Sequence, residues 1–147
     1  MLRALPFGIV FVPVALALLG LAWGGPWTWG TVAFVFGLVP ALDLVLGRDE
    51  LNPEPATYEA PTAHWAFRFM TWAIVPALLG LTGASAWAVG AYSYAPLELA
   101  GIVVSCGVAA GGLGITVAHE LIHKTGAFER NLGQALLLNS CYMHFYI

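Results

Sequence analysis

Hydrophobic residues fall into four long runs along the chain, separated by short polar or aromatic connections. Each run is close to the roughly 20 residues that a helix needs to cross the hydrocarbon core of a bilayer. Pro13, Pro40 and Pro76 lie inside these runs, where membrane helices tolerate proline better than soluble helices do. The pattern predicts four transmembrane helices, near residues 5–22, 27–46, 65–89 and 97–118.

The end of the chain has a different pattern. Residues 125–130 form a short polar break, and residues 132–147 are apolar again with polar side chains on mixed faces. This predicts a partial interfacial or re-entrant helix, and we expect an all-α integral membrane helix bundle. The first run is long for a signal peptide, contains Pro13 and lacks a small-x-small cleavage site before Trp23. We therefore predict that it is retained as a helix.

Composition supports the same class of protein. Hydrophobic residues make up 60% of the chain and charged residues only 9%, whereas soluble domains carry about 25% charged residues. The bilayer is therefore the expected solvent. Five Lys and Arg residues are too few for a phosphate-binding surface, which excludes nucleic acid as a partner. Cys106 and Cys141 lie in apolar stretches and are predicted to be small buried side chains without a disulfide.

The positions of the basic residues predict the orientation in the membrane. All five fall on one side of the four-helix arrangement: Arg3, Arg48, Arg68, Lys124 and Arg130. The connections on the other side, residues 23–30 and 90–96, contain no Lys or Arg, and tryptophans cluster near them. By the positive-inside rule, the N-terminus and the region after the fourth helix are predicted to be cytoplasmic.

The motif with the most specific chemistry is His119-Glu-Leu-Ile-His123, at the end of the fourth run. Two imidazoles four residues apart lie on one face of a helix, one turn from each other. Such a pair can bind one iron, zinc or copper ion. The alternative is a pair of interfacial histidines at a helix end. We favour metal binding, because two of only four histidines stand at ligand spacing beside a carboxylate.

Glu120 completes the string H-E-x-x-H, in which zinc metalloproteases use the glutamate as general base. A catalytic zinc also needs a third protein ligand, but His144 is the only later histidine and no carboxylate follows Glu129. Two interpretations of Glu120 remain: a hydrogen-bond acceptor for a metal ligand, which we favour, or a partner for Lys124.

Three other features have weaker predictions. Asp43 is either a functional acid inside a span or a helix-end residue close to Arg48. Glu98 is predicted to be an ordinary interfacial residue. Gly107 and Gly111 form a G-x-x-x-G pattern, which predicts close packing of the fourth helix.

Taken together, these motifs resemble a known family. The segment Ala118-His-Glu-Leu-Ile-His-Lys124, followed by Glu129-Arg130 and His144-Phe145, resembles the membrane-bound alkane monooxygenases, which are relatives of histidine-box desaturases and xylene monooxygenases. Residues 119–124 reproduce the family's first histidine box. Residues 143–147 look like the lead-in to its second box, with Met143 where glycine is usual. Residues 43–53 are similar to the loop after the family's second helix.

The resemblance implies six membrane helices and a cytoplasm-facing histidine cluster that holds two iron ions. It also implies hydroxylation of terminal C–H bonds of an alkane with O₂, electrons from rubredoxin, and a bacterial inner membrane as the location. Only His119 and His123 map onto iron ligands of the family. His144 maps onto the lead-in and is not assigned as a ligand, and no further catalytic or cofactor-binding residue is assigned.

The second and third histidine boxes are absent from the sequence. We therefore expect residues 1–147 to be the N-terminal part of one hydroxylase domain, inactive alone. The alternatives within the oxidoreductases are a xylene-type monooxygenase or a fatty-acid desaturase. Outside them, the alternatives are a membrane zinc protease and a non-enzymatic four-helix protein with incidental histidines.

Overall fold

The computed structural model describes residues 8–47 and 65–146, which form helices and contain no strand. The predictions made for Arg3 and Arg48 lie outside the described residues. The elements in chain order are α1 (Val12–Trp23), η2 (Gly25–Trp29), α2 (Gly30–Val32), η3 (Ala33–Leu38), α3 (Val39–Leu46), α5 (Trp65–Ala91), α6 (Pro96–Gly107), η4 (Val108–Leu113), α7 (Gly114–Ile122), α8 (Ala127–Asn139) and η5 (Met143–Tyr146).

These elements join into longer apolar helices. Three are long and apolar enough to cross a membrane: Gly25–Leu46, Phe67–Ala91 and Pro96–Ile122. A shorter apolar helix, Gly8–Trp23, precedes them, and the start of the first predicted span lies outside the described residues. The prediction of an all-α membrane helix bundle is confirmed. The protein is an integral membrane protein.

Two of the long helices contain π-helical segments, η3 and η4. For η3 the sequence gives a cause, because Pro40 follows it. Proline has no N–H to donate to the carbonyl of Phe36, and its ring clashes with that carbonyl. A locally wider helix relieves both problems. Single π-turns inside α-helices are frequent at functional sites.

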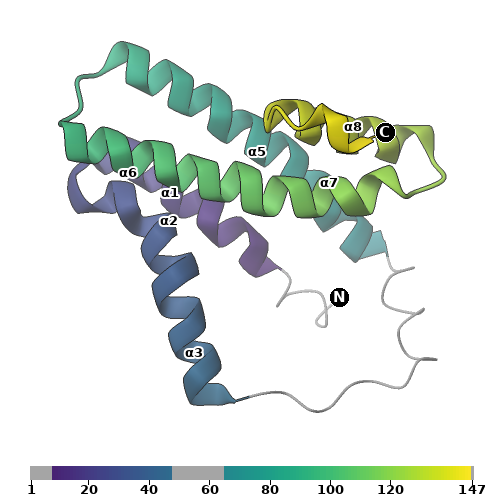
Figure 1. The fold of residues 1–147 in the computed structure, drawn as a ribbon, viewed down its shortest axis with the longest axis horizontal. Coiled ribbons are helices and arrows are strands. Elements are labelled where there is room, and N and C mark those ends of the chain that lie inside the picture. The colour runs from purple at the N-terminus through teal and green to yellow at the C-terminus, as the bar shows by residue number, and fades with distance from the viewer. Residues whose placement is uncertain (1–7, 48–64, 147) are drawn as a thin grey trace.

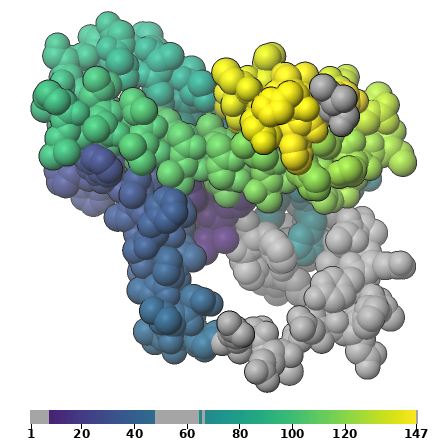
Figure 2. Space-filling model, in the orientation of Figure 1, coloured from purple at the N-terminus to yellow at the C-terminus, as the bar shows by residue number. Residues whose placement is uncertain are grey.

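The core lies where α1, α5, α7 and α8 meet (Figure 1). Its buried hydrophobic side chains are Val14, Ala17, Ile74, Val75, Leu78, Leu81, Ala109, Ala118, Leu121, Leu136 and Leu137. In contrast, α3 has no buried residue and extends away from the bundle, as Figure 2 shows in blue. Asp43 is exposed on α3, so the described residues give it no partner that decides between its two interpretations.

Close helix packing occurs, but not at the predicted glycines. Apart from the backbone of its own helix, no described atom lies within 4 Å of a Cβ built on Gly107 or Gly111, so the described residues place no close neighbour at the predicted glycines. The close approach is at Gly101, where a Cβ would clash with the Thr28 side chain. A buried hydroxyl holds this contact, because Ser105 Oγ donates to the Thr28 carbonyl at 2.6 Å. A second buried hydroxyl joins α2 to α1, because Thr31 Oγ1 donates to the Pro13 carbonyl at 2.8 Å.

The α1–η2 and α5–α6 connections lie together at one end of the bundle (Figure 1), which we call the turn end. Glu98 joins them: its Oε1 accepts the Gly25 N–H at 2.5 Å and its Oε2 accepts the Ala95 N–H at 2.8 Å. The Tyr94 hydroxyl donates to the Leu21 carbonyl at 3.2 Å. Glu98 is therefore a structural link between two loops, which the prediction of an ordinary interfacial residue missed.

Both cysteines are free, as predicted, but they differ in burial. Cys106 is half-buried, with its Sγ 3.0 Å from Ser85 Oγ. Cys141 is exposed in the turn after α8, with a φ of 53°. The prediction that it is buried is wrong, because α8 ends before this residue and the turn faces outward.

Candidate metal centre

The histidine pair lies on the last turn of α7, at the end of the bundle opposite the turn end. We call this the histidine end. Gly114, Ala118 and Leu121 form the buried face of α7, which leaves His119 and His123 exposed on an adjacent face. Their ring centroids are 4.7 Å apart with an interplanar angle of 77°. The carboxyl end of a helix carries partial negative charge, which stabilises a bound cation.

The chain returns to this pair after α8. The Phe145 ring lies 5.4 Å from the His119 ring. Phe145 and Tyr146 line an open cavity of about 340 Å³ together with Ile122 and the two histidines. His144 is not part of this lining, because its exposed ring packs on Tyr142 at 4.3 Å.

Within the described part of the chain, no third His, Cys, Asp or Glu lies close enough to complete a metal site. The geometry therefore provides two adjacent imidazole ligands on one helix face. They fit part of a metal site whose remaining ligands come from elsewhere.

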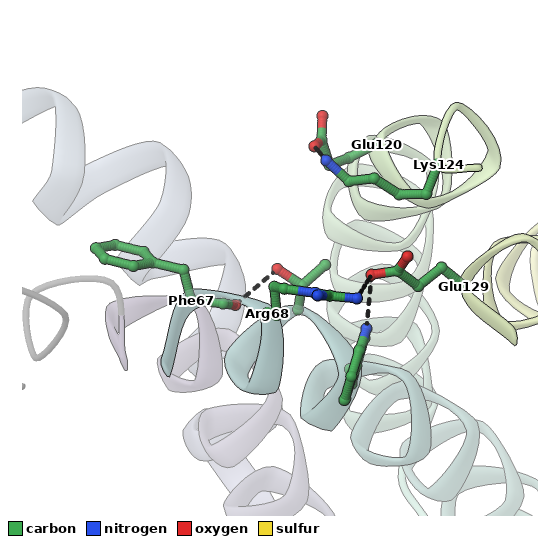
Figure 3. Close-up of polar contacts among 7 residues, drawn as sticks. Phe67, Arg68, Glu120, Lys124 and Glu129 are labelled. Carbon is green, nitrogen blue, oxygen red and sulfur yellow. Dashed lines mark hydrogen bonds and ion pairs between the residues drawn. The ribbon is translucent and has the colours of Figure 1, made fainter. Parts of the chain in front are cut away.

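Glu120 forms an ion pair with Lys124, in which Nζ donates to Oε1 (Figure 3). The Glu120 side chain is 61% exposed, and it has no hydrogen bond to a histidine among the described contacts. Of the two interpretations of Glu120, the structure shows the ion pair with Lys124. It does not show the hydrogen bond to a metal ligand that we favoured from the sequence. The reason is geometric, since a glutamate and a lysine at i and i+4 meet readily on a helix.

Glu129 is the residue near the site that sequence reasoning missed. It is 7% exposed, and its Oε1 accepts the Arg68 Nη2 donor at 3.1 Å and the Trp72 Nε1 donor at 3.3 Å (Figure 3). The Arg68 guanidinium also lies 5.2 Å from the Trp72 ring centroid, and Phe128 packs edge-on to Trp72 at 5.4 Å. These contacts fasten α8 to α5.

A second contact fastens α8 to α7. A Cβ on Gly133 would lie 2.7 Å from Ile122 Cγ2 and 3.0 Å from the Ala118 carbonyl oxygen. Each of those residues directly precedes one of the two histidines in the sequence. The Glu129 ion pair and the Gly133 crossing therefore hold the α7–α8 hairpin, and the two histidines on it, against α5.

No family model matches the chain, but several curated proteins do. Alkane 1-monooxygenase 2 of Pseudomonas aeruginosa is 40% identical over 130 residues, which are 86% of this chain and 34% of that protein. Alkane 1-monooxygenase of Pseudomonas putida is 33% identical over 116 residues, covering 79% and 29% respectively. The chain belongs to the alkane 1-monooxygenase family. Alkane 1-monooxygenase 2 of Alcanivorax borkumensis is 32% identical over 127 residues, covering 81% and 31%.

Membership of the alkane 1-monooxygenase family confirms the resemblance drawn from residues 118–147. It argues against the membrane zinc protease and the non-enzymatic helix protein. The chain spans about a third of the length of the curated relatives it matches.

Proposed function

We propose that this chain is the N-terminal part of the single domain of a membrane alkane hydroxylase, in which His119 and His123 are iron ligands. The observation that carries the proposal is the imidazole pair, with centroids 4.7 Å apart, at the end of a helix long enough to span a membrane. Similarity to proteins named alkane 1-monooxygenase supports it.

The donor set agrees with a non-haem diiron site. Imidazole nitrogen is a suitable ligand for iron, and the structure provides two imidazoles on one helix face. The remaining ligands come from parts of the protein that correspond to the uncovered two thirds of the relatives. Two bound irons supply O₂ activation and oxygen insertion into a terminal C–H bond. The role of the chain itself is to hold two ligands at a fixed spacing.

An apolar cavity provides a place for an alkyl chain. It has a volume of about 420 Å³ and lies between the two π-helical segments, lined by Pro13, Val35, Phe36, Val108, Gly112 and Leu113. Leu113 lies six residues before His119, which is about 9 Å along a helix. An alkane that partitions into the bilayer reaches this cavity from the lipid, without crossing water.

Electron delivery fits the basic histidine end. We place this end at the cytoplasmic face of a bacterial inner membrane, by the positive-inside rule. Rubredoxin would then dock near Lys124 and Arg130. Lys124 is paired with Glu120, and Arg130 donates to the Thr125 carbonyl at 2.7 Å, so both cations are held in fixed positions beside the helix that carries the ligands.

The test is iron content and octane hydroxylation of the purified full-length protein with rubredoxin and its reductase. We expect two irons per protein. His119→Ala and His123→Ala should each lose iron and at least about a hundredfold in activity. Loss of a residue that only hydrogen-bonds to a metal ligand already lowers metal affinity or activity by about 10–100-fold. His144→Ala is the matched control and should retain both. Zinc in place of iron, with proteolysis that Glu120→Gln abolishes, would contradict the proposal and favour the protease.

A further inference from the structure

A third cavity, larger than the two described above, lies at the turn end, far from the histidines. Its volume is about 640 Å³, within the roughly 300–1,000 Å³ typical of small-molecule sites. Leu18 and Leu21 of α1 and Ala84 and Ala88 of α5 give it an aliphatic wall. Its other walls are aromatic and polar, and they include the Glu98 carboxylate.

Glu98 brings an unbalanced negative charge to this cavity. A carboxylate can accept about four hydrogen bonds, and two of its positions are filled by the Gly25 and Ala95 N–H groups. Neither donor carries a net charge. The described Lys and Arg residues are all at the histidine end. Among the described residues, therefore, no cationic side chain neutralises Glu98.

Aromatic rings surround the same space. Trp87 and Tyr92 pack edge to face at 5.5 Å, and both line the cavity with Trp23. Trp23 packs edge-on to Trp27 at 5.1 Å, but Trp23 and Trp87 are still 61% and 64% exposed, so much of each side chain remains uncovered. Tryptophans are common at membrane–water interfaces, which explains why these rings lie at an end of the spanning helices. It does not explain why a carboxylate lies among them. Rings grouped around a negative charge are the arrangement that binds ammonium ions.

We propose that this cavity binds the ammonium headgroup of a phospholipid, specifically phosphatidylethanolamine. The ammonium lies between the Glu98 carboxylate and the aromatic rings, donating to the free carboxylate positions. One acyl chain lies along the aliphatic wall of α1 and α5. Since the cavity is at the end of the spanning helices, a membrane lipid reaches it from its own leaflet. The bound headgroup anchors the turn end at the membrane surface.

The inference does not depend on the proposed hydroxylase function, and its test measures lipid rather than activity. The purified protein is placed in nanodiscs of equal amounts of phosphatidylethanolamine and phosphatidylglycerol with identical acyl chains. Lipids that remain bound after transfer to detergent are then measured by native mass spectrometry. We expect enrichment of phosphatidylethanolamine by roughly twofold to thirtyfold, the range for one cation–aromatic contact from an exposed to a desolvated site.

Two variants and a control separate the site from general effects. Glu98→Gln removes the charge and retains one acceptor oxygen, and Trp87→Leu removes an exposed ring. Each should bring the bound ratio close to that of the bilayer, with unchanged helical circular dichroism. If Glu98→Gln fails to fold, Trp87→Leu carries the test. Glu120→Gln removes an exposed carboxylate at the histidine end and should leave the enrichment unchanged.

Two results would overturn the proposal. One is a bound ratio equal to the bilayer ratio in the unmodified protein. The other is an enrichment that survives in the folded variants. Displacement of the retained lipid by free phosphoethanolamine at millimolar concentration would overturn the part assigned to the acyl chain, because a headgroup without a chain would then suffice.

Discussion

At the scale of the residue, each of the three glutamates that the structure describes has a role that follows from its surroundings. Glu120 is exposed and paired with a lysine on its own helix. Glu98 accepts backbone N–H groups from two separate loops. Glu129 is buried and accepts from a guanidinium and an indole. The same functional group is therefore a surface charge, a loop link or an anchor between helices.

The difference between Glu129 and Glu120 is measurable as stability. Glu129→Ala leaves the Arg68 and Trp72 donors without their acceptor, and we expect it to lower the free energy of unfolding by about 1–3 kcal/mol. Glu120→Ala removes an exposed ion pair and should change it by less than about 1 kcal/mol. Thermal unfolding in detergent micelles, followed by circular dichroism, compares the two. Equal losses in both variants would show that Glu129 is not an anchor.

At the scale of the element, the position of the histidine pair depends on how α8 crosses α7. Gly133 allows the two helix backbones to approach where Ala118 and Ile122 lie. Gly107 lies on α6, in the membrane helix Pro96–Ile122 that continues into α7. It has open space at its Cβ position. Two glycines in helices therefore have opposite tolerance for a methyl group.

Gly133→Ala should destabilise the protein by about 1–3 kcal/mol, because the added Cβ overpacks the crossing. It should also reduce iron retention, since α7 must shift to accommodate the methyl group. Gly107→Ala adds the same methyl group without a clash. It is expected to gain up to about 1 kcal/mol from the lower flexibility of alanine. Metal analysis and thermal unfolding of both variants check this, and a neutral Gly133→Ala would contradict the close crossing.

The sequence was sufficient to predict the helices but not their contacts. Apolar runs of spanning length predicted the membrane helices, and the four-residue spacing placed His119 and His123 on one helix face. The G-x-x-x-G pattern at Gly107 was misleading, because a pattern within one helix does not state which neighbour it meets. Glu98 and Glu129 bond to residues 73 and 61 positions away, and no local pattern encodes such distances.

At the scale of the whole molecule, the two ends of the bundle have opposite character. The histidine end carries Arg68, Lys124 and Arg130, and the turn end carries exposed tryptophans with the Glu98 carboxylate. The positive-inside rule predicts one orientation for such a molecule, with the histidine end in the cytoplasm. Under the proposed function, this orientation would place the histidine pair on the side where reduced electron carriers are available.

An introduced thiol makes this orientation testable. A membrane-impermeant maleimide should label the variant Cys141→Ser, Thr125→Cys in inside-out vesicles and not in right-side-out vesicles, because residue 125 is exposed in the connection between α7 and α8, beside the histidine pair. Cys141→Ser combined with Ser93→Cys moves the exposed thiol to the turn end, where residue 93 is exposed. Its labelling should have the reverse dependence. Cys106 is half-buried in a membrane helix and should react slowly from either side. Labelling of residue 125 only in right-side-out vesicles would place the histidines outside the cytoplasm and exclude delivery of electrons by a cytoplasmic carrier.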